Sequence, residues 1–405
     1  MGQWQFHTPD GVADLLPDEC EAKRTLEQRL RQLFRQRGYQ EIETPGIEFY
    51  DVYAAGSGFV PQEGLFKFFD QQGRILCLRY DGTVPAARLA ATLYRDVEPP
   101  LRFSYIGSMY RYHEYGGGRQ REFSQAGVEL MGSRTPESDA EVIATAIAAA
   151  LACGIEDLQV SIGQVEFFRG LLAEWQITGE DAALLPRLID SKEMVALEEL
   201  SDRLALPESA RDVLLKMASS YGTYDLLDDL ARLVTNPAAC AALDNLRAVL
   251  RILEDYDYLK YVSIDLGMLQ SLNYYTGIIF KGFTYGLGFP LFSGGRYDRL
   301  VEAFGRELSA TGFSIGVSLA LTALRRRDKA PAKPEDPLLL GYAPNRRAEA
   351  FTLAGRLRAA GQRVICDCQN QGPAALLAGY PSGPVAYLDE KGRLIQLREV
   401  RSCKC

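Results

Sequence analysis

The chain has no long apolar run, very few histidines and no secretory pattern at its start. No window approaches the ~18 uncharged apolar residues that a membrane helix needs, so a membrane-spanning segment is not expected. The first residues, MGQWQFHTPDG, lack the basic and then apolar segments of a secretory signal, which favours a cytoplasmic location. Only His7 and His113 are present. This scarcity nearly excludes mechanisms and metal sites that need several histidines.

Cysteines are present, but they do not follow a metal-binding pattern. Cys20, Cys77, Cys153 and Cys240 stand alone among apolar or helical neighbours, and we predict small buried side chains there. The other cysteines form two C-x-C pairs near the end of the chain: Cys366, Cys368, Cys403 and Cys405. Structural zinc sites usually separate paired ligands by about two to four residues. We therefore expect neither a metal nor another cofactor.

The charge balance argues against a nucleic-acid-binding protein. The net charge is −8, and binding to a phosphate backbone depends on cationic surface. The charge is uneven, because residues 337–405 carry +5 and the rest of the chain carries −13. This basic segment is either the solvated face of a small domain or a weak surface for RNA or an acidic partner.

The hydrophobic pattern predicts an α+β protein with two domains. Residues 18–35 and 137–153 have the apolar spacing of helices, and short strands are expected at 75–80, 102–112 and 123–131. Asp81-Gly82 and the glycines at 116–118 are interpreted as turns between antiparallel strands. We predict a first domain at 1–327 with a helical insertion at about 165–260, a Pro-rich linker at 328–337 and a small α/β domain at 338–405.

Polar residues interrupt the predicted strands at two places. Asp81 and Thr83 follow one strand, while Gln125 and Glu129 lie four residues apart in another and therefore share one face. A carboxylate and a hydroxyl suit an α-amino group, since a buried charge needs such partners. The simpler alternative is a solvated strand face. The pattern alone leaves both interpretations open.

Two further segments add candidate ligand-binding side chains. Arg111 ends a predicted strand before a glycine-rich loop, and Tyr274 and Tyr275 place two phenols in sequence. Phenols can line a flat polar ring, although aromatic residues at a strand edge are a structural alternative.

Several motifs, in order along the chain, resemble those of the histidyl-tRNA synthetase family. GYQEIETPGIE at 38–48 is similar to its first class II motif, and residues 103–132 are similar to its second, with YR, GRxREF and Q-x-x-x-E. LNYYTGIIF at 272–280 resembles its tyrosine motif, and SGGRYDRLVEAFG with GFSIGVSLALTAL resembles its third-motif region. The resemblance covers about four-fifths of the chain. It implies a class II synthetase-like antiparallel sheet flanked by helices.

The resemblance also implies roles for individual residues. Asp81, Thr83 and Gln125 match positions that hold the amino group of histidine, with Asp81 standing where the family usually has glutamate. Glu129 and one of Tyr274 and Tyr275 match the imidazole contacts. Arg111 matches the second-motif arginine that meets the ATP α-phosphate. The predicted histidine-binding set is Asp81, Thr83, Arg111, Gln125, Glu129, Tyr274 and Tyr275.

The chain departs from the synthetase pattern where that chemistry needs positive charge. Gln270 and Leu319 stand where the family has arginines, and Tyr112-His113-Glu114 disturbs the second motif. Fixed cations must offset the repulsion between a carboxylate and a triphosphate, and losing one such donor costs on the order of 3 kcal/mol. We therefore predict a binding site without activation chemistry and without catalytic residues.

This combination is similar to one family, the ATP phosphoribosyltransferase regulatory subunits. Membership implies a non-enzymatic subunit that partners a short-form catalytic transferase in histidine biosynthesis and reports L-histidine as feedback inhibitor. The first motif implies a homodimer within a hetero-oligomer. The alternatives are a divergent histidyl-tRNA synthetase and a non-catalytic tRNA-sensing module, the latter supported only by the basic C-terminal segment.

Overall fold

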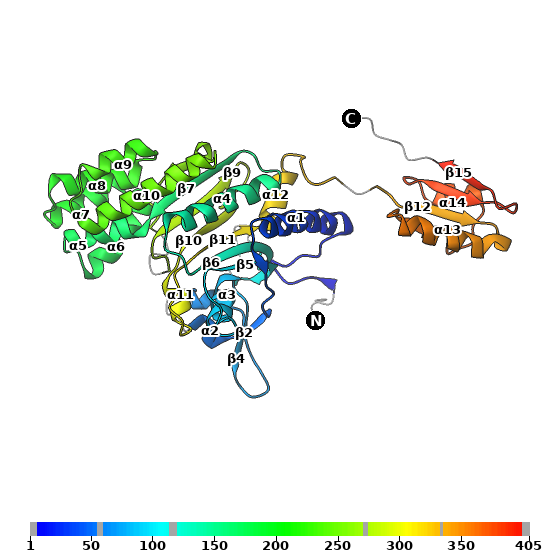
Figure 1. The fold of residues 1–405 in the computed structure, drawn as a ribbon, viewed down its shortest axis with the longest axis horizontal. Coiled ribbons are helices and arrows are strands. Elements are labelled where there is room, and N and C mark those ends of the chain that lie inside the picture. Colours follow the sequence, from blue (N-terminus) through cyan, green and yellow to red (C-terminus); the bar gives the residue numbers. More distant parts are fainter. Residues whose placement is uncertain (1–5, 55–59, 113–119, 270–273, 333–334, 399–405) are drawn as a thin grey trace. The chain divides into compact units, whose positions relative to one another are not determined.

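The computed structural model describes residues 6–54, 60–112, 120–269, 274–332 and 335–398. The chain forms two compact units, Met1–Pro331 and Ala332–Cys405 (Figure 1). The boundary between them falls within the Pro-rich segment 328–337. Among the described residues, no helix is long and apolar enough to cross a membrane.

An eight-stranded sheet forms the centre of the first unit. Its six central strands run antiparallel to their neighbours, but β1 pairs with β5 in parallel and β8 pairs with β7 in parallel. The predicted α+β class is therefore confirmed, but the sheet is mixed and not purely antiparallel. In spatial order the strands are β1 (Gln40–Glu41), β5 (Leu101–Tyr110), β6 (Glu122–Met131), β11 (Ala310–Gly316), β10 (Phe292–Arg296), β9 (Ile278–Thr284), β7 (Leu158–Gln164) and β8 (Val262–Ile264).

The two faces of this sheet pack against different elements. Ala126, Val128 and Leu130 of β6 belong to the large hydrophobic cluster, whereas Met131 on the other face belongs to a second cluster around α3. This alternation follows from the two-residue period of a strand. The helices on the first face are α1 (Pro17–Gln36), α4 (Pro136–Ala152) and α12 (Val317–Arg325), and those near the second are α2 (Tyr50–Ala54), α3 (Thr83–Ala91) and α11 (Arg299–Glu302).

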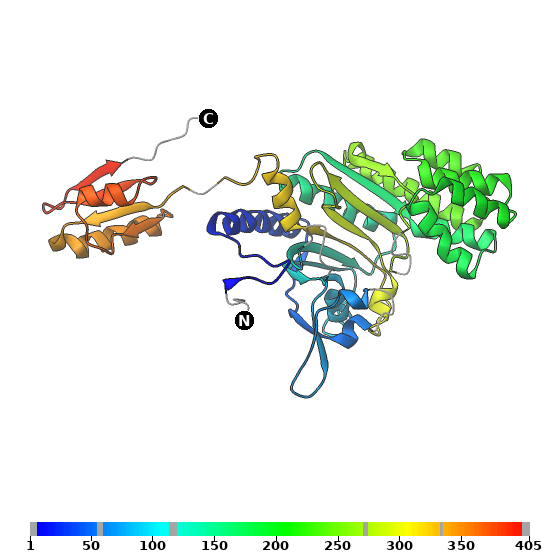
Figure 2. The ribbon, with the colours of Figure 1, turned by 180° about the vertical axis from the view of Figure 1, so that it is seen from behind.

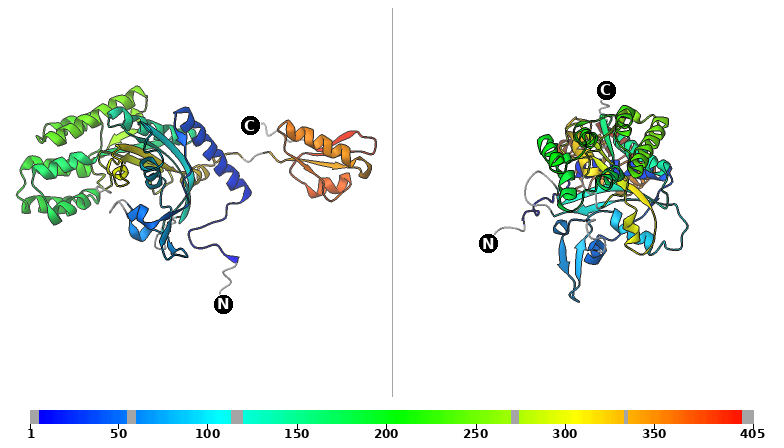
Figure 3. Two further views of the ribbon diagram at one scale, coloured as in Figure 1. Left: turned by 60° about the horizontal axis from the view of Figure 1, so that its bottom comes forward. Right: turned by 90° about the vertical axis from the view of Figure 1, so that its left-hand side faces the viewer.

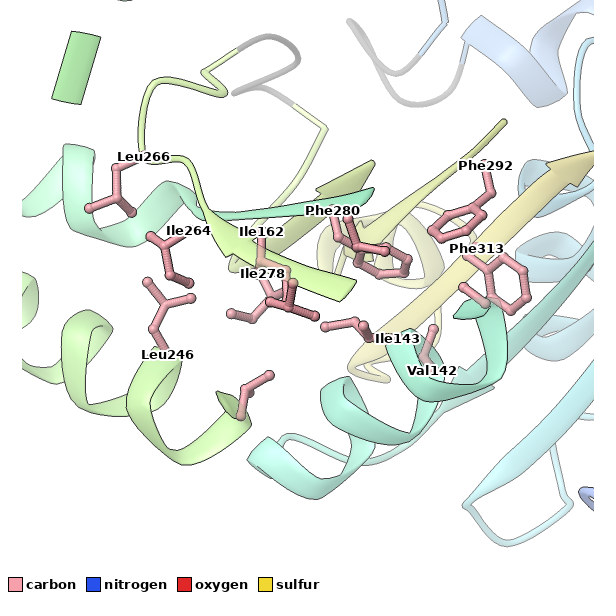
Figure 4. Packing of buried hydrophobic residues seen from close by; sticks show 14 of the residues in the cluster. Val142, Ile143, Ile162, Leu246, Ile264, Leu266, Ile278, Phe280, Phe292 and Phe313 are labelled. Atoms are coloured by element: carbon pink, nitrogen blue, oxygen red, sulfur yellow. The ribbon is translucent and has the colours of Figure 1, made fainter. Parts of the chain in front are cut away.

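Aromatic rings fill the interface between the sheet and α4. Phe280, Phe292 and Phe313 come from β9, β10 and β11, and their rings lie beside Val142 and Ile143 of α4 (Figure 4). The centroids of the first two rings are 6.3 Å apart, and those of the last two are 6.1 Å apart. Such edge-to-face pairs add about 0.5–1.5 kcal/mol each beyond the area that they bury.

The helical insertion lies between β7 and β8 and gathers at one end of the sheet (Figures 2 and 3). Asn236 caps its last helix, since the side-chain oxygen accepts hydrogen bonds from the amides of Ala238 and Ala239. The insertion comprises α5 (Val165–Glu174), α6 (Gly179–Asp190), α7 (Met194–Arg203), α8 (Glu208–Ser219), α9 (Tyr224–Ala231), α10 (Pro237–Asp255) and the 3-10 turn η3 (Leu259–Tyr261).

A separate three-stranded sheet projects from the second face of the first unit. It pairs β2 (Ile47–Phe49), β4 (Ile75–Leu78) and β3 (Lys67–Phe69) in an antiparallel arrangement, with the turn η2 (Gln62–Gly64) before β3. The segment EIETPGIEF at 41–49 is thus divided between two sheets, with Pro45 between β1 and β2. The predicted turn between strands at Asp81-Gly82 is wrong, because these two residues lead into α3, with Gly82 as its N-cap. The glycines at 116–118 lie outside the described residues.

The second unit is a small α/β domain. Its sheet has the order β13 (Val364–Cys366), β12 (Leu338–Tyr342), β14 (Val385–Leu388) and β15 (Leu394–Arg398), with only the last pair antiparallel. The helices are α13 (Arg347–Ala359) and α14 (Pro373–Gly379), and η4 (Pro344–Arg346) precedes the first of them.

The cysteines follow the sequence prediction only in part. Cys77 and Cys153 are buried, but Cys20 is exposed and Cys240 is half-buried, so those two predictions are wrong. Cys20 occupies the first turns of α1, where the apolar stripe faces the sheet and the cysteine lies off it. In the described part of the chain, no three His, Cys, Asp or Glu side chains are placed to hold a metal ion. Cys403 and Cys405 lie outside that part.

Candidate functional site

The candidate site is centred on the carboxyl group of Glu129. This side chain projects from β6 on the face opposite the large cluster and is 0% exposed. The hydroxyl of Tyr105 donates to its Oε1 at 3.3 Å, and the hydroxyl of Tyr297 donates to its Oε2. One phenol from β5 and one from the residue that follows β10 therefore hold one buried carboxyl.

Burial makes this carboxyl difficult to ionise. Burial raises the pKa of Glu129 from 4.5 to about 8, and the nearby Asp81 also raises this pKa. The hydrogen bonds from Tyr297, Thr83 and Tyr105 act in the opposite direction and lower it. Near neutral pH the group is therefore mainly protonated. It then carries one hydroxyl donor as well as acceptor oxygens.

Two glycines make space for this arrangement. A Cβ at Gly312 of β11, which is the register partner of Glu129, would overlap the glutamate's Oε2. A Cβ at Gly127 would overlap the phenol of Tyr105. Side chains are therefore absent at two positions next to the glutamate, one opposite it on β11 and one two residues earlier on β6. The carboxyl and the Tyr105 phenol occupy the space that this leaves.

Asp81 and Thr83 lie at the start of α3, next to this centre. Oδ1 of Asp81 accepts a hydrogen bond from the amide of Val84 at 3.0 Å, and the hydroxyl of Thr83 is 3.5 Å from that of Tyr105. Burial raises the pKa of the Asp81 carboxyl, opposed by the amides of α3 and by the charge of Arg111. This carboxyl is thus held rigidly where a cationic ligand group would favour its charged form.

The two tyrosines of the tyrosine motif line the same space. The ring of Tyr274 stacks on that of Tyr297, with centroids 5.7 Å apart, and meets the ring of Tyr275 edge-on at 4.7 Å. Burial raises the pKa of both phenols, with Asp81 and Glu129 among the contributing charges. Both tyrosines are therefore neutral donors at physiological pH.

A buried ion cluster fixes the turn that carries these tyrosines. The amide of Thr276 donates to the carbonyl of Arg296 at 2.7 Å, and the hydroxyl of Thr276 accepts from the amide of Asp298 at 3.0 Å. The guanidinium of Arg296 pairs with Asp139 of α4 at 2.9 Å and with Asp298 at 3.2 Å. Since Tyr297 lies between Arg296 and Asp298, the same cluster orients its hydroxyl.

Gln125 and Arg111 occupy the other end of the site's strand face. Gln125 is buried, and its Oε1 has no hydrogen-bond partner among the described residues. The guanidinium of Arg111 lies over the rings of Tyr80 and Phe123, 4.5 Å and 5.1 Å from their centroids, and its Nε donates to the carbonyl of Tyr80 at 3.3 Å. A buried acceptor without a partner costs about 1–3 kcal/mol, so a ligand donor there would be favourable.

Of the two positions where the synthetase pattern has an arginine, only Leu319 is among the described residues. Leu319 is on α12, half-buried against the large cluster and packed over Gly316. Gln270 and His113 lie outside the described residues. The structure thus contains an apolar side chain at one of the two positions where the synthetase pattern has a cation.

Sequence reasoning missed two residues that the structure places at the centre. Tyr105 and Tyr297 lie within the motif segments, but an aromatic residue in a predicted strand usually indicates core packing, so the sequence does not distinguish them. Glycines opposite or beside them, such as Gly127, are the available sequence signal. The structure brings five of the predicted residues into one mutually interacting group: Asp81, Thr83, Glu129, Tyr274 and Tyr275. Gln125 lies on the same strand face as Glu129, and Arg111 lies over the ring of Phe123 on that strand.

This arrangement can bind a small polar ligand that carries a cation and a flat hydrogen-bonding group. The Asp81 carboxyl and the Thr83 hydroxyl suit an ammonium, while the neutral Glu129 carboxyl and the phenols offer both donors and acceptors to a ring.

Comparisons with known proteins agree with this fold. The family described as histidyl-tRNA synthetase matches residues 11–319. The chain is 49% identical over 367 residues to an ATP phosphoribosyltransferase regulatory subunit of Acetivibrio thermocellus, covering 91% of this chain and 88% of that one. It is 37% identical over 391 residues to the subunit of that name in Desulforamulus reducens, covering 96% and 97%.

Solved structures show the same similarity. One is described as an ATP phosphoribosyltransferase regulatory subunit/histidyl-tRNA synthetase from Bacillus halodurans, with a TM-score of 0.85 and 32% identity, covering 96% of this chain and 99% of that one. A histidyl-tRNA synthetase from a Nostoc species has a TM-score of 0.80 at 20% identity, covering 96% of each chain, and supports the fold alone.

Proposed function

Because the chain belongs to the family of ATP phosphoribosyltransferase regulatory subunits, with a histidyl-tRNA synthetase-like domain, we propose that it binds L-histidine at the Glu129 site and regulates a short-form catalytic subunit. The observation that carries this proposal is the buried Glu129 carboxyl held by Tyr105 and Tyr297. The unpartnered oxygen of Gln125 lies on the same face of β6, four residues earlier along the strand. Together they provide neutral donors and acceptors for an uncharged imidazole.

The amino group of histidine has its own set of partners. Asp81 supplies a carboxylate whose ionised form an ammonium would stabilise, and Thr83 and Gln125 supply oxygen acceptors. The Tyr274 phenol interacts electrostatically with both Asp81 and Glu129. The ligand would therefore be fixed at both of its polar ends.

The same residues support a non-catalytic role. Leu319 offers no charge where the synthetase pattern has an arginine, and the retained Arg111 is stacked between two rings. An electrostatic donor of this kind is typically worth about 3–4 kcal/mol in the transition state. We therefore expect histidine to bind without being activated by ATP.

The experiment is to measure phosphoribosyltransferase turnover by the cognate short-form subunit with and without this chain while histidine is titrated. We expect turnover to change on mixing and histidine to inhibit only the mixture. Glu129→Ala should weaken inhibition at least tenfold, whereas Glu199→Ala, at an exposed position on α7, should leave it unchanged. Histidine-dependent ATP–pyrophosphate exchange by this chain alone would instead establish a divergent synthetase.

We also propose that the chain forms a homodimer through its small sheet. Ile47, Phe49, Phe69 and Ile75 on β2, β3 and β4 are between 42% and 73% exposed, which is a large apolar area for a free surface. Phe69→Lys should shift the chain to monomer in sedimentation experiments. Val195→Lys is the control, because Val195 is 70% exposed on α7, away from this sheet. A mass unchanged by Phe69→Lys would remove this surface from consideration.

A further inference from the structure

A cavity lies where the helical insertion meets the large sheet. Its volume is about 190 Å³, and its walls come from two sides. The insertion contributes residues from α6, α8 and the segments after them, and the sheet contributes β9 and the turn after β8. The lining residues on which the argument depends are Lys192, Tyr221, Asp265, Met268, Lys281 and Phe283.

The size of the cavity limits its occupant. At about 30 Å³ for each water in the liquid, the space corresponds to about six water molecules. Pockets for drug-sized ligands are usually about 300–1,000 Å³. A nucleotide is therefore too large, whereas a single small metabolite can be accommodated.

The charges around the cavity are balanced. Lys192 comes from the insertion, donates to the Tyr221 hydroxyl and lies 4.6 Å from the centroid of its ring. Lys281 comes from the sheet side, and both lysines act electrostatically on Asp265. Asp190 contributes a second carboxylate on the insertion side. Two cations and two anions around one small space match a ligand that carries both signs, and they give no net attraction for a polyanion.

Backbone contacts hold the Asp265 carboxyl at the cavity. Its Oδ1 accepts from the amide of Gly267 at 3.0 Å, and its own amide donates to the carbonyl of Ile162 at 2.9 Å. A Cβ at Gly267 would lie 2.7 Å from the carbonyl oxygen of Met217, so the turn can approach α8 only with glycine there. The acid is therefore positioned by the packing of the insertion against the sheet.

We propose that this cavity binds a free α-amino acid. Its carboxylate would face Lys192 and Lys281, its ammonium would face Asp265, and its side chain would lie against Met268 and Phe283. Burial raises the pKa of the Asp265 carboxyl, opposed by the Gly267 amide and the two lysines, and an ammonium beside it would likewise favour the charged form.

The cavity shares a wall with the Glu129 site. Met268 lines the cavity and also packs with Val165 and Ile279 in a small cluster against which Tyr275 lies. An occupant that moves Met268 would therefore shift a residue of the proposed histidine pocket. This coupling, unlike the binding itself, rests on the proposed function.

The test is isothermal titration calorimetry of the full chain with each of the twenty free L-amino acids, with acetate and inorganic phosphate as probes of one sign. The variants are Lys192→Gly and Asp265→Asn. Lys192 has φ of +58°, in the left-handed region that favours glycine, so this change removes the cation without straining the turn. Ala205→Gly, at φ of +49° elsewhere in the insertion, is the matched control.

We expect at least one amino acid to bind saturably, at least tenfold more weakly to Lys192→Gly and Asp265→Asn, and equally to Ala205→Gly. The proposal is overturned if no amino acid shows binding that depends on Lys192, or if acetate or phosphate binds as tightly. If Asp265→Asn does not fold, Lys192→Gly decides the question. Loss of histidine inhibition in Glu129→Ala is scored separately, so either proposal can fail without the other.

Discussion

The stability of the first unit should fall with rising pH because of one buried carboxyl. Glu129 has an ordinary pKa of 4.5 and a pKa of about 8 in the folded chain. Between these values the folded chain holds a proton at Glu129 that the unfolded chain has released. Raising the pH therefore favours unfolding, which is the opposite of the behaviour of a salt-bridged carboxyl.

The size of the effect follows from the two pKa values. Each pH unit inside the window removes about 1.4 kcal/mol from the free energy of unfolding, and the slope flattens as the pH approaches the folded pKa. From about pH 6 to about pH 8 the contribution of Glu129 should fall by about 2 kcal/mol. Glu129→Gln has a neutral side chain of similar shape and should lack this contribution.

The assay is urea unfolding of the wild type and Glu129→Gln across this pH range. Trp175 packs against the large hydrophobic cluster of the first unit, and residues 332–405 contain no tryptophan, so the change in its fluorescence follows the first unit and not the C-terminal domain. Asp81, Asp139 and Asp265 also have raised pKa values, and the comparison of the two chains removes their shared contribution. If the difference in unfolding free energy between the chains stays constant with pH, Glu129 is ionised and the reasoning is refuted.

Three other substitutions test the supports of the site and the insertion. Tyr297→Phe removes a donor to Glu129, so it should cost about 1 kcal/mol and move the pH window upward in the same urea series; an unchanged window would contradict the contact. Asp139→Asn leaves the buried guanidinium of Arg296 poorly compensated and should cost about 3 kcal/mol, measured by thermal melting, with a negligible loss arguing against the ion pair. Asn236→Ala should cost about 1 kcal/mol through the lost cap of α10, whereas Asn236→Asp should restore most of it.

The sequence predicted best those elements whose pattern is repeated along the chain. Ala22, Leu26, Leu30 and Phe34 recur at helical spacing and all are buried along α1. The ladder of β5 and β6 and the shared face of Gln125 and Glu129 also follow from simple alternation. In these segments the positions that the local pattern makes apolar are the positions that the fold buries.

The failures occurred where tertiary contacts override local preference. Residues 310–316, ATGFSIG, include two glycines, which disfavour a strand, yet they form the central strand β11, which pairs with β6 and β10 and leaves room at Gly312 for the Glu129 carboxyl. Asp81-Gly82 looks like a hairpin turn, but the Asp81 side chain bonds the Val84 amide and begins a helix. The family resemblance found most of the site, and only the folded chain indicates which phenols meet its acid.

The parallel pairing of β7 with β8 limits how the chain can pass from the first strand to the second. Parallel neighbours cannot be joined by a tight turn, and they need a crossover of about a dozen or more residues. The 19-residue α10 leads directly towards β8 and packs against α4, so it can serve as that crossover by itself. The region 165–236 would then be an elaboration added to an older strand–helix–strand unit. A chain that keeps α10 but lacks 165–236 should retain the large sheet, whereas a chain that also lacks α10 would have only residues 256–261 between the two strands, too few for a parallel connection.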